Sequence, residues 1–441
     1  MSTFASQNKS KQNMKLNDIA EFVTDKICSG SISLENYVTT DSLLQNKRGR
    51  EAAQNLPPMQ CALTHYKRGD VLVANIRPYL KKVWFADSEG GCSSDVLVFR
   101  AKIGHYPSFL YTALMQDVFF DYAMSGAKGS KMPRGDKDQI MRYELPTFTS
   151  LEEENIGNMM VDIMSKINAN RQINDNLEAM AKQLYDYWFV QFDFPNEEGK
   201  PYKASGGAMV WNEKLKREIP QGWNDCVLGD YIGRITNGLN PRKNFVLGSG
   251  NNYYVTIRSL VGTTIDWNNC DRCDDEALSK INSRSQLQIG DIIFSAIGTI
   301  GRTYYILEKP TNWNISETSF TLRAKENVPN DFFYGMLRSN EIQIKADKAA
   351  MGSTLRCLVM DSLCSLQYIE IPSYMMKLFA AKVSPLYRQI HRNNKEIAEL
   401  TKQRDELLPL LMNGQATVNY HLSVLFLSPF ILYRDQYNFM T

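Results

Sequence analysis

The sequence has few cysteines and histidines for its length, with only eight cysteines and four histidines among 441 residues. The cysteines are too scattered for a disulfide scaffold, so we expect a reduced, cytoplasmic protein. The first residues lack the apolar core of a signal peptide. No apolar run reaches the roughly 18 residues that a membrane span needs, and the run from Leu422 to Tyr433 is short and interrupted by Pro429. We therefore expect no membrane partner.

A large excess of either charge is also absent. Lys and Arg number 50 and Asp and Glu number 48, for a net charge of +2. This balance excludes a wholly basic nucleic-acid coat, so any surface for a polyanion must be local. Hydrophobic residues make up 43% and charged residues 22% of the chain, which is ordinary globular composition and excludes disorder.

The motifs of common enzymes are missing as well. The sequence contains no phosphate-binding loop, no H-E-x-x-H zinc motif and no nucleophile elbow. Cys270 and Cys273 form a single C-x-x-C, and a zinc site would need a second such pair at a regular distance. We therefore predict no catalytic residues, no metal site and no cofactor in this chain.

What the sequence does contain is a long internal repeat. Gly69 to Leu72 (Gly-Asp-Val-Leu) recurs as Gly290 to Ile293 (Gly-Asp-Ile-Ile), about 220 residues later. Other segments match at nearly the same spacing: Lys81 with Arg302, Phe99–Ala101 with Leu322–Ala324, and Gly129–Lys131 with Gly352–Thr354. A repeat of this length is too long for a solenoid and indicates two copies of one domain.

Each copy is followed by a segment with heptad spacing. Apolar positions alternate four and three residues apart, as in a coiled coil. Asn170 and Asn393 fall at equivalent places, where a seam asparagine would fix the register. Two matching runs favour mutual pairing over a lone amphipathic helix. The predicted seam residues are Ile156, Met160, Ile163, Ile167, Asn170, Leu177 and Leu184 in the first helix and Leu386, Ile390, Asn393, Ile397, Leu400 and Leu407 in the second.

The sequence thus predicts an α+β protein. Two similar globular domains are joined by two long helices that form an antiparallel coiled coil, with pseudo-twofold symmetry. An aromatic cluster ends the first helix (Tyr185, Tyr187, Trp188, Phe189, Phe192 and Phe194), and is either a docking surface or a core contact with the second domain. The predicted parts are an N-terminal arm (1–14), first domain (15–149), first helix (150–194), linker (195–218), second domain (219–373), second helix (374–414) and C-terminal tail (415–441).

Basic residues recur near glycines at matching places in both copies. Glycine allows close approach to phosphates, while Lys, Arg, Ser and Thr supply donors. Any one such loop could simply be solvated, but recurrence in both copies favours DNA binding. The predicted DNA-binding residues are Arg77, Lys81, Lys82, Lys128, Ser130, Lys131, Arg134, Arg242, Lys243, Arg302, Ser353, Thr354 and Arg356.

With these features in view, the chain resembles the specificity subunits of type I restriction–modification enzymes. Leu184–Pro195 is similar to the family's central segment, Ile219–Trp223 to the start of a target recognition domain, and Leu400–Gly414 to the distal helix. The first copy lacks a clear I-P-x-G-W start. The apolar tail after Val418 also departs from the family pattern.

The resemblance implies that each target recognition domain reads one half of a bipartite site on double-stranded DNA. The helices would set the gap and hold two modification subunits that bind S-adenosylmethionine. Two restriction subunits, which use ATP and Mg²⁺, can join. Two alternatives stay open at this point: a specificity chain of a type IIB-like enzyme, and a coiled-coil scaffold without DNA binding. Steep weakening of DNA binding with salt would separate the last from a true reader.

Overall fold

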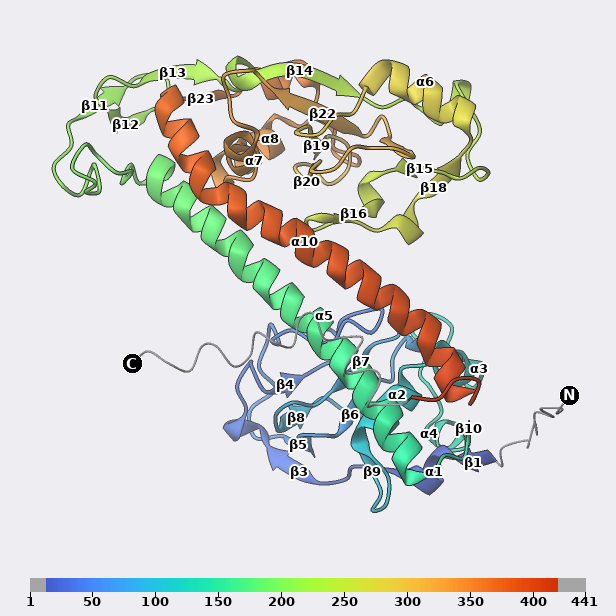
Figure 1. Cartoon of the computed structure of the whole chain (residues 1–441). Helices are drawn as coiled ribbons and strands as arrows, with labels where there is room; N and C mark the ends of the chain where they lie inside the picture. The colour runs from blue at the N-terminus through green and yellow to red at the C-terminus, as the bar shows by residue number, and fades with distance from the viewer. Residues whose placement is uncertain (1–12, 419–441) are drawn as a thin grey trace, which may run out of the picture. The chain divides into compact units, whose positions relative to one another are not determined.

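The computed structural model describes residues 13–418 of the chain, with the side chain of Lys243 excepted. Within them the chain forms two compact units. Unit 1 contains residues up to 169 and from 396 onward, and unit 2 contains residues 170–395. Each unit therefore holds one globular domain together with a part of both long helices (Figure 1). Most of the predicted N-terminal arm and C-terminal tail lies outside the described residues.

The first domain is built on a four-stranded antiparallel sheet in the order β2-β9-β6-β7. A second sheet has the order β3-β5-β8-β4. The apolar residues of α2 and α3 bury against the first sheet and form the core of unit 1. The bounds are β2 Ala20–Phe22, β3 Lys26–Cys28, β4 Tyr37–Val38, β5 Ala62–Tyr66, β6 Val71–Ala74, β7 Val83–Phe85, β8 Gly90–Cys92, β9 Val96–Ala101, α2 Pro107–Leu114 and α3 Asp117–Ser125.

Short elements complete the first domain. β1 (Asn13–Lys15) pairs with β10 (Glu144–Pro146), so Asn13 and Met14, which precede the predicted boundary at 15, also belong to the first domain. The remaining elements are α1 Leu16–Ile19, η1 Ser29–Ser31, η2 Pro78–Leu80 and α4 Lys137–Ile140.

The second domain repeats this plan with the sheet order β14-β22-β19-β20. Its second sheet has only three strands, in the order β18-β15-β21, and α6 packs beside it. The bounds are β13 Asn224–Val227, β14 Ile232–Asn237, β15 Asn252–Val255, β16 Leu260–Val261, β17 Thr264–Ile265, β18 Asp271–Cys273, α6 Asp275–Ser285, β19 Ile292–Ser295, β20 Thr303–Tyr305, β21 Trp313–Ile315, β22 Ser319–Ala324, α7 Asn330–Leu337, α8 Asn340–Ala349, α9 Met360–Cys364 and β23 Gln367–Glu370, with 3-10 turns η4 Leu228–Tyr231, η5 Pro241–Lys243, η6 Ile257–Ser259 and η7 Trp267–Asn269.

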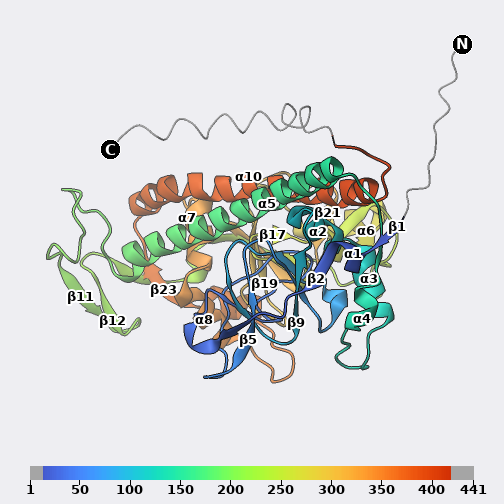
Figure 2. The same ribbon diagram turned by 90° about the horizontal axis from the view of Figure 1, so that it is seen from below.

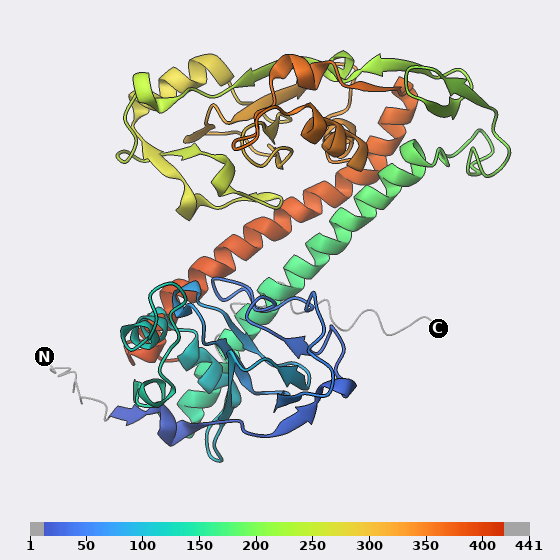
Figure 3. The ribbon, with the colours of Figure 1, turned by 180° about the vertical axis from the view of Figure 1, so that it is seen from behind.

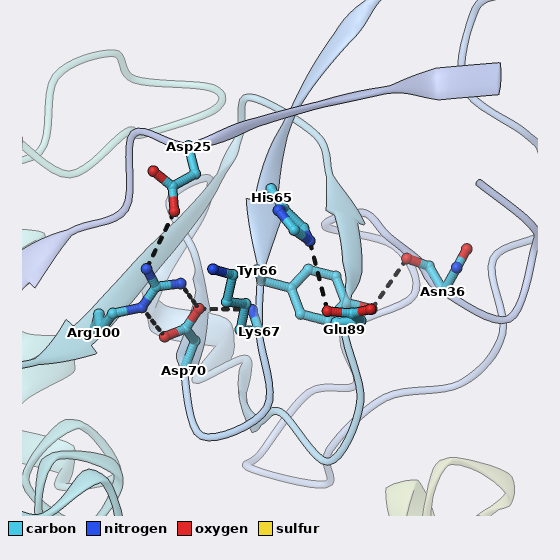
Figure 4. Close-up of polar contacts among 8 residues, drawn as sticks. All are labelled: Asp25, Asn36, His65, Tyr66, Lys67, Asp70, Glu89 and Arg100. Carbon is cyan, nitrogen blue, oxygen red and sulfur yellow. Dashed lines mark hydrogen bonds and ion pairs between the residues drawn. The ribbon is translucent and has the colours of Figure 1, made fainter. Parts of the chain in front are cut away.

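A buried ion pair occupies the same place in both domains. Arg100 donates from Nε and Nη2 to the two carboxylate oxygens of Asp70, at 2.8 and 2.7 Å (Figure 4). Arg323 donates in the same way to Asp291, at 2.7 and 2.9 Å. Each aspartate begins the hairpin from β6 or β19, and each arginine lies on the neighbouring strand, β9 or β22. The matched topology and the matched pair confirm that the two domains are similar.

The predicted linker contains a hairpin that the sequence reading missed. β11 (Met209–Asn212) and β12 (Arg217–Pro220) pair in antiparallel register, so the linker 195–218 is partly ordered structure (Figures 1 and 3). The turn between them ends at Lys216, whose φ is 53°. The glycines and charged residues of the linker predicted a loop. The hairpin was missed because its strands are short and flanked by turn residues.

The two long helices are α5 (Ser150–Tyr185) and α10 (Ser373–Met412). The second matches the predicted 374–414 closely. The first is shorter than the predicted 150–194, because a π-helical turn, η3 (Asp186–Val190), follows it and the chain then leaves the helix. The aromatic cluster explains this ending, since Tyr185, Trp188, Phe189, Phe192 and Phe194 are buried in the core of unit 2. The cluster is therefore a core contact, with Tyr187 left exposed.

The helices pack side by side within each unit (Figures 1 and 2). In unit 1, Ile156, Met160, Ile163 and Ile167 share one core with Leu400, Leu408 and Leu411. In unit 2, Tyr185 contacts Phe379 near the start of α10, while Asn174 bonds Asn393 a few turns later, so the segments run antiparallel. Of the other predicted seam residues, Asn170, Ile390 and Asn393 are buried, and Leu177, Leu184, Leu386, Ile397 and Leu407 are half-buried.

The seam asparagines make direct contacts. Asn393 Nδ2 donates to Asn174 Oδ1 at 2.8 Å, and Asn174 Nδ2 donates to Asn394 Oδ1 at 2.8 Å. Buried amides that bond one another stabilise one register, because a slip of either helix leaves them unpaired.

Candidate nucleic-acid interface

Three surface segments of the first domain are joined by backbone hydrogen bonds. They are the segment Gln45–Arg50, the turn Arg77–Lys81 between β6 and β7 (the first-domain turn), and the loop Lys128–Arg134 (the first-domain loop). The amides of Asn46 and Lys47 donate to the carbonyls of Leu80 and Lys81, at 3.0 and 2.8 Å, and the Arg77 amide donates to Pro133 at 2.8 Å. Residues that are far apart in sequence thus form one cationic surface.

The second domain carries a counterpart of this arrangement. The loop Met351–Cys357 (the second-domain loop) is closed by a bridge between its ends, as Lys128 and Arg134 close the first-domain loop. The Gly298 amide donates to Arg356 at 2.8 Å, the same bond that Arg77 makes to Pro133. The glycines predicted to matter, Gly129 and Gly352, have φ of 96° and 101°, values that other residues rarely adopt. The two loops are therefore equivalent in structure as well as in sequence.

The first-domain loop is strongly exposed and basic. Lys128 and Arg134 are 84% and 56% exposed, and Ser130 and Lys131 are exposed as well. Lys128 pairs with Asp136 at 3.1 Å and Arg134 with Asp95 at 3.2 Å. Exposed ion pairs of this kind are weak, so these side chains can exchange a carboxylate for a DNA phosphate at little cost.

A lysine pair shares one carboxylate beside the first-domain turn. Lys47 and Lys81 lie 2.7 and 3.0 Å from the same oxygen of Asp117, the first residue of α3. Burial lowers the pKa of Lys47, while Asp117 opposes the shift. Burial alone would raise the pKa of Asp117, but hydrogen bonds from the two ammonium groups outweigh it and lower that pKa below its ordinary value. Two cations against one anion leave a net positive charge here.

The strand register corrects one residue match of the sequence analysis. The hairpin of the second domain is one residue shorter, so Arg302 corresponds to Lys82 and not to Lys81. The carbonyl of Lys82 accepts from Ala74, and that of Arg302 accepts from Ser295 in the same way. The match with Lys81 was wrong because a constant offset cannot show a deletion inside a turn.

Lys82 and Arg302 also use their side chains for the fold. Lys82 is buried, and its ammonium donates to the carbonyl of Thr40. Burial lowers the pKa of Lys82. Arg302 donates to the carbonyls of Ile257 and Leu260, each at 3.1 Å. Both cations tie the segment that follows a strand of the second sheet, β4 or β15, to the first sheet, so Lys82 and Arg302 each have a structural role.

The remaining predicted residues fall on the surface of the second domain. Ser353 and Thr354 are exposed in the second-domain loop, while Arg356 is held by Asp347 at 2.6 Å. Arg242 is exposed in η5, and the backbone of Lys243 completes that turn. The sequence also indicated Gln45–Arg50 as a loop with side chains that could read bases, and Arg48 is exposed there. Sequence reasoning missed the exposed Tyr79 of the first-domain turn, for which the neighbouring Arg77 was the available signal.

Among the described residues, no group of three or more His, Cys, Asp or Glu side chains is arranged to hold a metal ion. Over the same part of the chain, no helix combines the length and the apolar character needed to cross a membrane.

Two similar α+β domains on a pair of long helices define a fold class that a solved structure shares. The chain matches the crystal structure of a type I restriction–modification S subunit from M. genitalium with a TM-score of 0.53, at 15% identity, covering 93% of this chain and 99% of that one. This likeness concerns the fold alone.

Curated proteins that the chain resembles in sequence are specificity subunits of type I restriction enzymes. The chain is 25% identical to the specificity subunit of the type I restriction enzyme MjaIX of Methanocaldococcus jannaschii, over 84% of this chain and 83% of the relative. It is 21% identical to that of HindI of Haemophilus influenzae, over 91% and 98%. No protein-family model matches the chain. The resemblance to type I specificity subunits, drawn from the helix and domain motifs, is thereby confirmed.

Proposed function

We propose that this chain is the DNA sequence-specificity subunit of a type I restriction–modification complex. Each of its two domains would read one half of a bipartite site. The observation that carries the proposal is the duplication itself. Equivalent loops, each closed by the same backbone bridge and each bonded to the neighbouring turn, stand on two copies of one domain.

The chemistry of the loops supports contact with DNA. Exposed Lys, Arg, Ser and backbone amides are the donors that proteins direct at phosphates, and these contacts position a reader before its side chains test base edges. On this proposal Lys128, Lys131 and Arg134 serve the first half-site, and Ser353 and Thr354 serve the second. Arg77 and Lys81 add charge beside the first loop.

The long helices would set the gap between the half-sites and provide surfaces for partner subunits. The helices have 36 and 40 residues, and they carry exposed apolar side chains outside the seam, among them Ile173, Met180 and Leu410. We propose that two modification subunits supply methyl transfer with S-adenosylmethionine, that two restriction subunits can add ATP- and Mg²⁺-dependent cleavage, and that this chain itself is not catalytic. A pseudo-twofold arrangement of the domains belongs to the same proposal, as does a cytoplasmic location.

The direct test is to map methylated positions across a genome in cells that express the modification subunit with and without this chain. The proposal predicts a bipartite methylated motif only when the chain is present. Methylation that is identical in the two strains would refute it. DNA binding by the purified complex should also weaken steeply as salt rises, because phosphate contacts release counterions.

A further inference from the structure

Backbone strain is concentrated in the first domain. Eight described residues other than glycine have positive φ. Four of them lie in the segment Gln45–Arg50 and in the first-domain turn, which backbone hydrogen bonds join: Asn46, Lys47, Arg77 and Lys81. The left-handed conformation is unfavourable for residues with a Cβ, and such residues gather at ligand-binding sites when the fold over-determines them.

Arg77 is strained in a second way. Its φ and ψ are 53° and 61°, and Pro78 follows it. Proline disfavours helical conformations, including this one, in the residue before it. In addition, the Nε atom of Arg77 is buried without an acceptor among the described residues, which costs the desolvation of that N–H.

The second domain shows that these costs are avoidable. Gly298 makes the bond to its loop that Arg77 makes in the first domain, and its φ is 84°. Gly301 precedes Arg302 as Lys81 precedes Lys82, and its φ is 88°. The same turn is therefore built with glycine at both left-handed positions in one domain and with cations at both in the other.

Packing does not account for the cations. Asp117 is already neutralised by Lys47, whose side chain is only 6% exposed, whereas Lys81 is a second partner and 30% exposed. Lys81 therefore adds a charge that the fold does not need. The turn stands beside Lys128 and Arg134, bonded to their loop through Pro133.

We propose that Arg77 and Lys81 occupy these strained positions because they contact phosphates of the half-site that the first domain reads. The second domain, with Gly298 and Gly301, makes no cationic contact from its turn. This inference rests on the proposed function and deepens it, since it makes the two readers unequal in how they hold DNA.

The test uses the full chain assembled with its modification subunits. Arg77→Gly, Lys81→Gly and the double variant are compared with Lys216→Gly. The control also exchanges a left-handed lysine (φ 53°) for glycine and removes one charge, but lies in the β11–β12 turn of unit 2. Binding to a duplex with the mapped methylation motif is followed from 50 to 200 mM salt, together with the thermal unfolding of each complex.

We expect the double variant to unfold at the same or a higher temperature, because glycine relieves the strain. It should nevertheless bind about tenfold more weakly, with a salt slope about two units less steep, because each phosphate that the protein neutralises contributes about 0.9 to the slope. Two further duplexes each have one half-site scrambled. The difference in affinity between the double variant and the wild type should disappear on one of these duplexes and remain on the other. Lys216→Gly should bind as the wild type does.

Wild-type affinity and slope in the double variant would overturn the inference, as would an equal loss of affinity in Lys216→Gly. A lower unfolding temperature in the double variant would also overturn it, because the residues would then serve the fold. If the wild-type complex itself fails to prefer the motif, the proposed function fails, which is a different result.

Discussion

At the scale of single residues, each domain contains one buried carboxylate held by one arginine. Asp70 and Asp291 are 3% and 1% exposed, and Arg100 and Arg323 cap them from the next strand. The sequence repeat placed these four residues in matching segments. It could not pair them, because the pairing depends on which strands are neighbours in the sheet.

Removing one partner should therefore be costly. We predict that Arg323→Met lowers the free energy of unfolding by about 3–5 kcal/mol, because it leaves a buried carboxylate without its cation. Arg100→Met should cost a similar amount, and Asp291→Asn added to Arg323→Met should recover part of the loss. Chemical unfolding measures all three. A loss below about 1 kcal/mol in both single variants would contradict the prediction.

The shared carboxylate of Asp117 gives a pH signature. Its pKa is lowered in the folded protein, so its interaction with the buried Lys47 stabilises the fold above its unfolded pKa and is lost as pH falls through the folded one. Asp117→Asn should be less stable than the wild type at pH 7, with the difference shrinking below about pH 4. A difference that does not change with pH would exclude this role. Unfolding curves at several pH values provide the measurement.

At the scale of elements, the long helices were the most predictable part. The heptad spacing predicted both helices, and the predicted end of the second lies within two residues of the observed end of α10. The end of the first was missed because the aromatic cluster fits a helical face until tertiary packing draws it into the second domain's core. The sequence also offers no reason for Gly157 within α5, whereas the structure shows that a Cβ there would lie 2.4 Å from Ser108 Oγ.

The asparagine pair in the seam tests how the helices are specified. Asn174→Leu should destabilise the protein by about 1–3 kcal/mol, because the buried Asn393 loses the acceptor of its Nδ2 group and Asn394 loses a donor. Adding Asn393→Leu should recover most of this loss, since two leucines can pack together where two amides bonded. A double variant as unstable as the sum of the two single variants would show that the amides do not act as a pair.

The turns were the least predictable elements. Spacing identified the basic loops, but it placed Lys81 against Arg302 because it could not detect that one turn is a residue shorter. It also could not show that Lys82 is buried against Thr40. Such details depend on φ and ψ in short turns, where the identity of a single residue, glycine or not, is a weak signal.

At the scale of the whole molecule, both helices pass from one unit into the other, with the boundaries at 169/170 in α5 and 395/396 in α10. We predict that inserting seven residues with heptad spacing at both boundaries keeps the seam and leaves each unit intact. Seven residues add about 10.5 Å, so the gap in the methylated motif should grow by about three base pairs. Motif mapping reads this directly, and an unchanged gap would remove the role of the helices as spacers.

The central claim is that each domain reads one half-site. It is tested most directly by a chain with two copies of the first domain, in which residues 225–369 are replaced by residues 13–146. These segments start and end at strand partners, because Asn13 pairs with Pro146 as Asp225 pairs with Ile369, and each segment ends just before the long helix that follows it. Copurification with the modification subunit controls for folding. The account predicts a methylated motif made of two inverted copies of one original half-site, and a motif that keeps both original halves would contradict it.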